Sequence, residues 1–71
     1  HEAVDDVQFM IGRAHEAAQR WSDAATTYRH YAKQGRDPNR RVEANTRLGI
    51  VLTHMDDARG ADKAFDAAVA A

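Results

Sequence analysis

The 71-residue chain contains no cysteine, and its ten Lys and Arg residues nearly balance its eleven Asp and Glu residues. Without cysteine, disulfide bonds and thiol chemistry are excluded, although the redox compartment stays open. The balanced charge, with no run of one sign longer than a pair, argues against a nucleic-acid surface. No apolar run approaches the roughly 18 residues that suggest a membrane-spanning helix. We therefore expect neither nucleic-acid binding nor direct membrane insertion.

The chain is also short of bulky apolar residues. Apolar residues make up 44% of it, but many of them are alanine, which contributes little area to a core. A chain of this size buries only about 60% of the surface that it exposes when unfolded. We expect a thin core that depends on neighbouring sequence for stability. Because the sequence opens at His1 and closes on alanines, we also expect it to be part of a longer protein.

Four glycines and one proline leave long uninterrupted segments, and the apolar spacing in these segments is helical. Two stripes recur at intervals of three and four residues: Val4, Val7, Ile11, Ala14 and Ala18, and then Ala44, Leu48, Val51, Leu52 and Met55. No segment alternates with a period of two. The pattern predicts an all-α fold.

Capping and turn residues divide the chain into four predicted helices. The first spans residues 4–19. Ser22 has the side chain to cap the second, which ends near Gly35. Asp37 then precedes Pro38, a capping carboxylate followed by a proline at the first helical position.

The third predicted helix therefore runs from Pro38 to about His54. Asp56 or Asp57 caps the fourth, which continues to the end of the chain. All connections are short, and short connections make consecutive helices antiparallel neighbours.

An internal correspondence appears when the sequence is shifted by 37 residues. The shift places similar residues on one another: Gly12 on Gly49, Ile11 on Leu48, Ala14 on Val51, Ala24 on Ala61 and Tyr28 on Phe65. The similarity lies in residue type and size rather than in identity. It predicts two helical hairpins built on the same plan.

The pattern resembles two tandem tetratricopeptide repeats, residues 5–36 and 37–71. The matching residues are Ile11, Gly12, Trp21, Ala24, Tyr28 and Pro38 in the first unit, and Leu48, Gly49, Leu52, Ala61, Phe65 and Ala68 in the second. The resemblance implies an α-α superhelix of two antiparallel hairpins. It also implies that Gly12 and Gly49 allow close helix approach and face Ala24 and Ala61.

Three features depart from the common pattern of this family. His15 occupies a position that is usually bulky and apolar, and Tyr31 occupies one that is usually small. The offset of 37 residues exceeds the family's usual repeat by about three. Tyr31 and the longer link resemble a subgroup from bacterial cell-envelope proteins. That resemblance implies an envelope or periplasmic location rather than the cytoplasm, whereas the residues themselves leave the compartment unknown.

Catalytic and metal-binding motifs are incomplete in this sequence. His15-Glu16 begins a helical zinc-protease motif, but the second histidine that it needs four residues after the first is replaced by Gln19. The histidines at 1, 15, 30 and 54 show no ligand spacing on one helix. Ser22 is better explained as a cap, and no glycine-rich loop is present to hold a phosphate. We predict a protein that is not an enzyme and has no metal or cofactor; a metal-dependent hydrolase would require bound zinc.

Trp21 admits two interpretations. The simpler one is a plug that packs the hairpin turn against the helices. The other is an anchor for a partner, since tryptophan is enriched at binding hot spots.

The family resemblance also implies a groove lined by the first helix of each hairpin. Its residues would be Asp6, Phe9, Arg13, Glu16, Ala17, Glu43, Thr46, Ile50, Thr53 and His54. Phe9 and Ile50 would hold an apolar side chain of a peptide and Arg13 would pair with an acid. Ordinary exposed residues would explain the same pattern. Phe9 and Arg13 stand where one subtype requires lysine and asparagine to clamp a C-terminal carboxylate, so that activity is not expected.

The leading hypothesis is a non-enzymatic scaffold that presents this groove to a peptide or docks other subunits. The alternatives are a structural spacer within a longer solenoid, or a self-association module. Two repeats are fewer than the three or so that are normally needed for stability. The last helix would expose apolar residues, namely Ala61, Phe65, Ala68 and Val69. We therefore expect self-association through a terminal face or dependence on flanking sequence.

Overall fold

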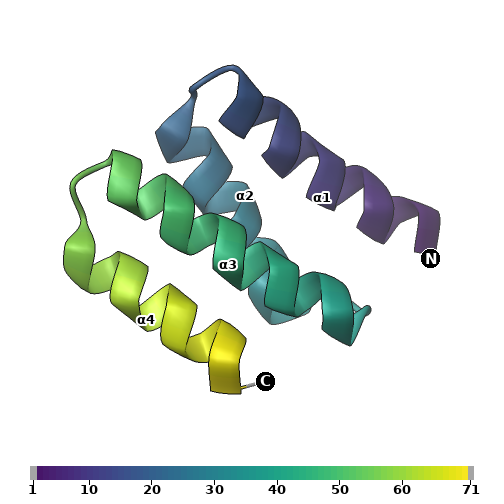
Figure 1. The fold of residues 1–71 in the computed structure, drawn as a ribbon. Helices are drawn as coiled ribbons and strands as arrows, with labels where there is room; N and C mark the ends of the chain where they lie inside the picture. Colours follow the sequence, from purple (N-terminus) through teal and green to yellow (C-terminus); the bar gives the residue numbers. More distant parts are fainter. Residues whose placement is uncertain (1, 71) are drawn as a thin grey trace.

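A computed structural model describes residues 2–70 of the chain, with side chains described from residue 7 onwards. Over this range it consists of four α-helices and no strand: α1 (Glu2–Ala17), α2 (Trp21–Gln34), α3 (Pro38–His54) and α4 (Ala58–Ala70). Figure 1 shows α1 with α2, and α3 with α4, as two antiparallel hairpins. The predicted all-α class is confirmed, and the helix ends lie within a few residues of the expected ones.

The helices form a flat body. Each helix packs mainly against its neighbours in sequence, and α1 touches α3 only slightly. The Cα positions extend over 34 × 29 × 13 Å. In Figure 1, α2 lies behind α1 and α3, while α4 lies on the other side of α3 from α1. As a result α3 is covered by both α2 and α4, whereas α1 is covered mainly by α2 within the described chain.

The two hairpin turns have the same backbone conformation, 37 residues apart. Gln19 and Asp56 are the only described non-glycine residues with positive φ, at 60° and 59°. In both turns the N–H of the following residue donates to a carbonyl five positions earlier, which is the hydrogen bond of a Schellman helix end. The pairs are Arg20 with His15 at 2.8 Å and Asp57 with Leu52 at 2.9 Å.

Capping residues start two of the later helices as expected. The Asp37 Oδ1 atom accepts hydrogen bonds from the backbone N–H of Asn39 (3.0 Å) and of Arg40 (3.5 Å), with Pro38 at the first helical position. At α4, Asp57 rather than Asp56 provides the cap, since its Oδ1 accepts from Gly60 N–H at 2.9 Å.

The capping role predicted for Ser22 is wrong. Helix α2 begins at Trp21, so that Ser22 lies within its first turn, and the N-cap residue Arg20 makes no side-chain capping bond. Arg20 stands at the N-cap position, and its side chain has no oxygen that could accept a hydrogen bond from a backbone N–H of the first turn.

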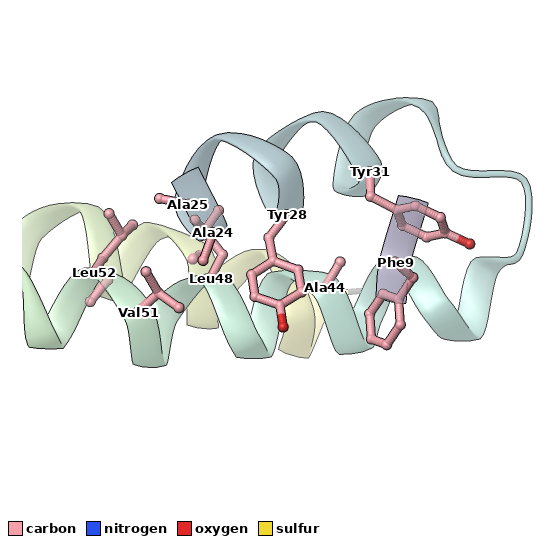
Figure 2. Close-up of a cluster of buried hydrophobic side chains, with 11 residues drawn as sticks. Phe9, Ala24, Ala25, Tyr28, Tyr31, Ala44, Leu48, Val51 and Leu52 are labelled. Carbon is pink, nitrogen blue, oxygen red and sulfur yellow. The ribbon is translucent and has the colours of Figure 1, made fainter. Parts of the chain in front are cut away.

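The core lies mainly along α2 and α3, as Figure 2 shows. Its buried residues are Phe9, Ala24, Ala25, Tyr28, Tyr31, Ala44, Leu48, Val51, Leu52, Ala61 and Ala64. Three of them form an aromatic cluster. The Phe9 ring lies 5.9 Å from the ring of Tyr28, at a tilt, and 5.6 Å from that of Tyr31, edge-on, and both are favourable arrangements for aromatic pairs. One α1 side chain thus fits between two residues one helical turn apart on α2.

Gly12 and Gly49 are both buried at helix contacts, but each faces an aromatic ring instead of the expected alanine. A Cβ atom on Gly12 would lie 2.7 Å from Cε1 of Tyr28, and one on Gly49 would lie 2.5 Å from Cε1 of Phe65. The ring, one turn beyond the alanine in sequence, fits against the glycine because the missing Cβ leaves the space that it needs.

The apolar stripe of α1 does not face the core. Such a stripe usually does, yet Val7 is 54% exposed and Ile11 is 40% exposed; Ala14 and Ala18 are exposed as well. Phe9 and Gly12 occupy the inner face instead. The side chain of Val4 lies outside the described residues. In α3, by contrast, the corresponding stripe is buried from Ala44 to Leu52, and only Met55 is exposed.

Helix α4 exposes part of the surface that was expected at the end of the chain. Val69 is 88% exposed, and Phe65 and Ala68 are half-buried. Ala61 is buried, so its expected exposure is corrected; it lies on the side of α4 that packs against α3.

Candidate interaction surfaces

A polar network beside the core joins three helices. The Tyr28 hydroxyl of α2 donates to Oε1 of Glu16 on α1 at 2.8 Å, and Nε of Arg47 on α3 donates to the same oxygen at 3.1 Å. Burial, followed by the hydrogen bond to Glu16, raises the pKa of Tyr28 to about 12. One carboxylate oxygen therefore connects the first hairpin to the second.

The residues predicted to line the groove of α1 and α3 have several different environments. Arg13, Ala17, Glu43, Thr53 and His54 are exposed; Glu16, Thr46 and Ile50 are half-buried; and Phe9 is buried. The side chain of Asp6 lies outside the described residues. The Thr46 hydroxyl donates to the Val42 carbonyl and that of Thr53 to the Gly49 carbonyl. Both hydroxyls are thus bound to their own helix.

Phe9 cannot act as the apolar anchor that was predicted for this groove. It is only 2% exposed, because Tyr28 and Tyr31 enclose its ring and the guanidinium carbon of Arg40 lies 5.0 Å from the ring centre. Its role is in the core. Glu16 is likewise used internally, by Tyr28 and Arg47. On the face formed by α1 and α3, a partner could contact mainly the side chains of Arg13 and Glu43 and part of Ile50.

Trp21 stacks on His54. The two ring centres are 4.2 Å apart and the planes differ by 1°. Trp21 is half-buried and packs against the core, while His54 is exposed on the last turn of α3. This contact connects the first hairpin turn to the second hairpin, so that Trp21 packs the turn against the helices, which is the first of the two interpretations considered above.

A different groove lies between α2 and α4, with α3 as its floor. Its volume is about 470 Å³, and it is lined by Arg29, Ala32, Lys33, Asn45, Leu48, Leu52, Gly60, Lys63, Ala64 and Ala67. Leu48, Leu52 and Ala64 supply an apolar floor. This groove opens on the opposite side of α3 from the contact with Glu16.

The groove has positive charge at its edges. Arg29 and Lys33 come from α2 and Lys63 from α4, and all three are exposed. No acidic residue is among the described residues that line the groove. A ligand that combines negative charge with an apolar side chain would therefore match both the edges and the floor.

This groove was not predicted from the sequence, because the family resemblance implies a groove on the first helix of each hairpin. A local signal was available. Arg29 and Lys33 are four residues apart, which places two cations on one face of a helix, and the alanines at 32 and 64 leave space between α2 and α4. Lys63 could not be assigned to the same surface without knowing how the hairpins pack.

Metal ligands do not gather in the described part of the chain: no group of three His, Asp or Glu side chains there lies close enough to hold an ion. None of the described helices is long and apolar enough to cross a membrane. No protein-family model, curated protein or solved structure matches the chain. A function can therefore be proposed only from the surfaces themselves.

Proposed function

We propose that the chain is a non-enzymatic protein-interaction module built from two tetratricopeptide-like hairpins, and that the groove between α2 and α4 binds an acidic peptide segment with an apolar side chain. The observation that carries this proposal is the combination of an apolar floor with three cations at its edges. Leu48 and Leu52 are themselves nearly buried, so affinity would come mainly from apolar burial against Ala32, Ala67 and the aliphatic parts of Lys33 and Lys63. The cations would orient the ligand and select against basic segments.

The repeat assignment is supported by features that recur at an offset of 37 residues. The turns at Gln19 and Asp56 share a positive φ, and Gly12 and Gly49 each lie against an aromatic ring of the following helix. Two hairpins with the same turn and the same glycine–ring contact are what a tandem repeat requires, because each unit must present equivalent surfaces to its neighbours.

The groove can be tested with two synthetic helical peptides, one composed of Glu and Leu and the other of Lys and Leu, titrated into the 71-residue chain and followed by NMR. The acidic peptide should perturb the methyl signals of Leu48, Leu52 and Ala64, and the basic peptide should not bind. Binding should weaken as salt is added, because the charges at the edges are exposed.

Charge-reversal variants locate the site. Lys33→Glu combined with Lys63→Glu should weaken binding of the acidic peptide roughly tenfold, since two attractions become repulsions worth a few tenths to one kcal/mol each. Arg13→Glu, also exposed but on α1, should change binding less than about twofold. Perturbations centred on Arg13 and Ile50 would place the ligand on the α1 and α3 face and refute the proposed groove.

A spacer role is the second candidate, and one observation favours it. The outer faces of α1 and α4 expose apolar residues, notably Val7 and Val69, as expected of units that stack against neighbours. If neither peptide binds, the groove proposal fails and the spacer role is the one retained.

A further inference from the structure

The outward face of α1 corresponds, at the 37-residue offset, to the face of α3 that packs on α2. Val7, Ile11 and Ala14 are exposed on α1. Their counterparts on α3 are Ala44, Leu48 and Val51, which are all buried. The two helices present similar side chains at these positions, but α2 covers α3 and no described helix covers this side of α1.

The 37-residue offset also relates the outward face of α4 to a surface of the first hairpin, and that surface is covered by α3. A cleft of about 290 Å³ lies on the outward face of α4, lined by Thr53, Asp56, Ala58, Ala61, Asp62 and Phe65. Their counterparts are Glu16, Gln19, Trp21, Ala24, Ala25 and Tyr28. Arg47 of α3 contacts Glu16, and His54 of α3 contacts Trp21. The cleft is thus the position that a helix equivalent to α3 would occupy next.

We propose that a second copy of this chain binds there, with its α1 seated on α4 and the cleft in the register that α3 adopts on the first hairpin. The contact joins two different faces of the molecule. Each copy in a pair therefore keeps one face unused, so that assembly is head-to-tail and continues beyond a dimer as concentration rises.

Matched residue changes argue for a second copy as the occupant. Within the chain, the junction between the hairpins contains the polar trio Tyr28, Glu16 and Arg47. At the proposed contact the counterparts are Phe65 and Thr53 of one copy and Met10 of the next. Hydroxyl, carboxylate and guanidinium are all lost together. Met10, 64% exposed in the single chain, would lie on the Phe65 ring, which is a favourable sulfur–aromatic contact.

A second pair changes in a matched way. Trp21 and His54 stack at the internal junction, and their counterparts are Ala58 of one copy and Ala17 of the next. Both large rings are replaced together by methyl groups, so neither copy presents a ring without its stacking partner, and the contact is open at this point. A partner of unrelated sequence would not be expected to match both sets of changes.

The core offers a third correspondence. Ala25 and Leu52 are both buried in the core, and their counterparts are Asp62 of one copy and His15 of the next. Two apolar groups are replaced by an acid and an imidazole, which can form a hydrogen bond with each other. Nδ1 of His15 is buried without a partner in the described structure, so the hydrogen bond to Asp62 of the other copy would use Nε2–H as its donor.

The test uses two variants that each damage one face. Met10→Lys changes the α1 face. Val69→Lys changes the α4 face, since Val69 is the counterpart of Ala32, which packs against the core at the internal junction. Both residues are largely exposed, so folding should be retained, as circular dichroism can check. Thr26→Lys is the control, because Thr26 is exposed on α2 and its counterpart is Lys63. Sedimentation velocity is measured from micromolar to millimolar concentration.

The wild type and Thr26→Lys should form species larger than a dimer at high concentration, and Met10→Lys and Val69→Lys should each remain monomeric. An equimolar mixture of these two variants should form a dimer that does not grow, because only one intact pair of faces is available. A wild type that stays monomeric at millimolar concentration would overturn the proposal and leave a flanking segment as the occupant. A Val69→Lys variant that still dimerises would overturn it in favour of a symmetric contact through α1.

Discussion

Gly12 and Tyr28 are in such close contact that the ring of Tyr28 occupies the space of a side chain on Gly12: a Cβ atom there would lie 2.7 Å from Cε1 and 2.9 Å from Cδ1 of the ring. Tyr28 is fully buried, and its hydroxyl is held by Glu16. The corresponding ring of Phe65, above Gly49, is half-buried at the edge of the molecule. The two glycine–ring contacts are equivalent in the repeat, but the ring of Phe65 has more room to move than the ring of Tyr28.

This difference predicts unequal effects of the same substitution. Gly12→Ala should lower the free energy of unfolding by roughly 1–3 kcal/mol, because the confined ring cannot move away. Gly49→Ala should change it by less than about 1 kcal/mol, since the gain in helix propensity offsets a smaller rearrangement of Phe65. Urea denaturation of both variants measures the two values. Equal losses would show that Phe65 is as confined as Tyr28.

The Tyr28 hydroxyl predicts a loss of stability at high pH. Folding raises the pKa of Tyr28 to about 12, above the value of about 10 for an unfolded tyrosine. The stability that the protonated hydroxyl contributes is therefore fully present below about pH 10 and is lost as pH rises toward 12. The Tyr28→Phe variant should be less stable than the wild type by about 1–2 kcal/mol at neutral pH, and the difference should shrink over that window. Parallel stability curves for the two proteins up to pH 12 would contradict the assignment.

The helix caps predict that the capping residue of one hairpin would also stabilise the equivalent position of the other. Asp37→Ala and Asp57→Ala should each cost about 1 kcal/mol, since each removes the acceptor of a backbone N–H. Arg20, which starts α2 without a side-chain bond, is the counterpart of Asp57. Arg20→Asp should stabilise the protein by about 0.5–1 kcal/mol. Thermal unfolding monitored by circular dichroism compares the three, with Arg20→Ala as the control for loss of the arginine.

Phe9 and Ile50 were predicted together as apolar contacts for a peptide, and they should now behave differently. Phe9→Ala removes a ring from the aromatic cluster and should cost about 3–5 kcal/mol, enough to unfold much of a domain of this size. Ile50→Ala, at a half-buried position, should cost less than about 2 kcal/mol. Guanidinium chloride titration distinguishes them; a folded Phe9→Ala variant of nearly normal stability would restore Phe9 as a surface residue.

Helix positions could be predicted because their signals are local. The Asp37-Pro38 start and the helical apolar spacing each act within one or two turns, and the 37-residue correspondence then predicted two similar hairpins. Which side of each helix turns toward the core could not be predicted in the same way. Phe9 lies between the stripe residues Val7 and Ile11, and only the positions of Tyr28 and Tyr31 on α2 explain why Phe9 turns inward and its neighbours outward.

The candidate groove was missed for a related reason. Its edges come from α2 and α4, which are separated by all of α3, and the charges at 29, 33 and 63 become neighbours only when the second hairpin packs on the first. Glu16 was predicted as a groove residue from its position on α1. Its pairing with Arg47, 31 residues away, depends on tertiary packing that no local pattern encodes.

The shared oxygen of Glu16 has a consequence for cooperativity. Because Tyr28 and Arg47 both donate to it, fraying of α1 would deprive an inner tyrosine and the adjacent helix of the same acceptor at once. Local opening of the first helix should therefore extend across the junction, and amide protons in the middle of α3 should exchange with deuterium together with those of α1 and α2 rather than with those of α4.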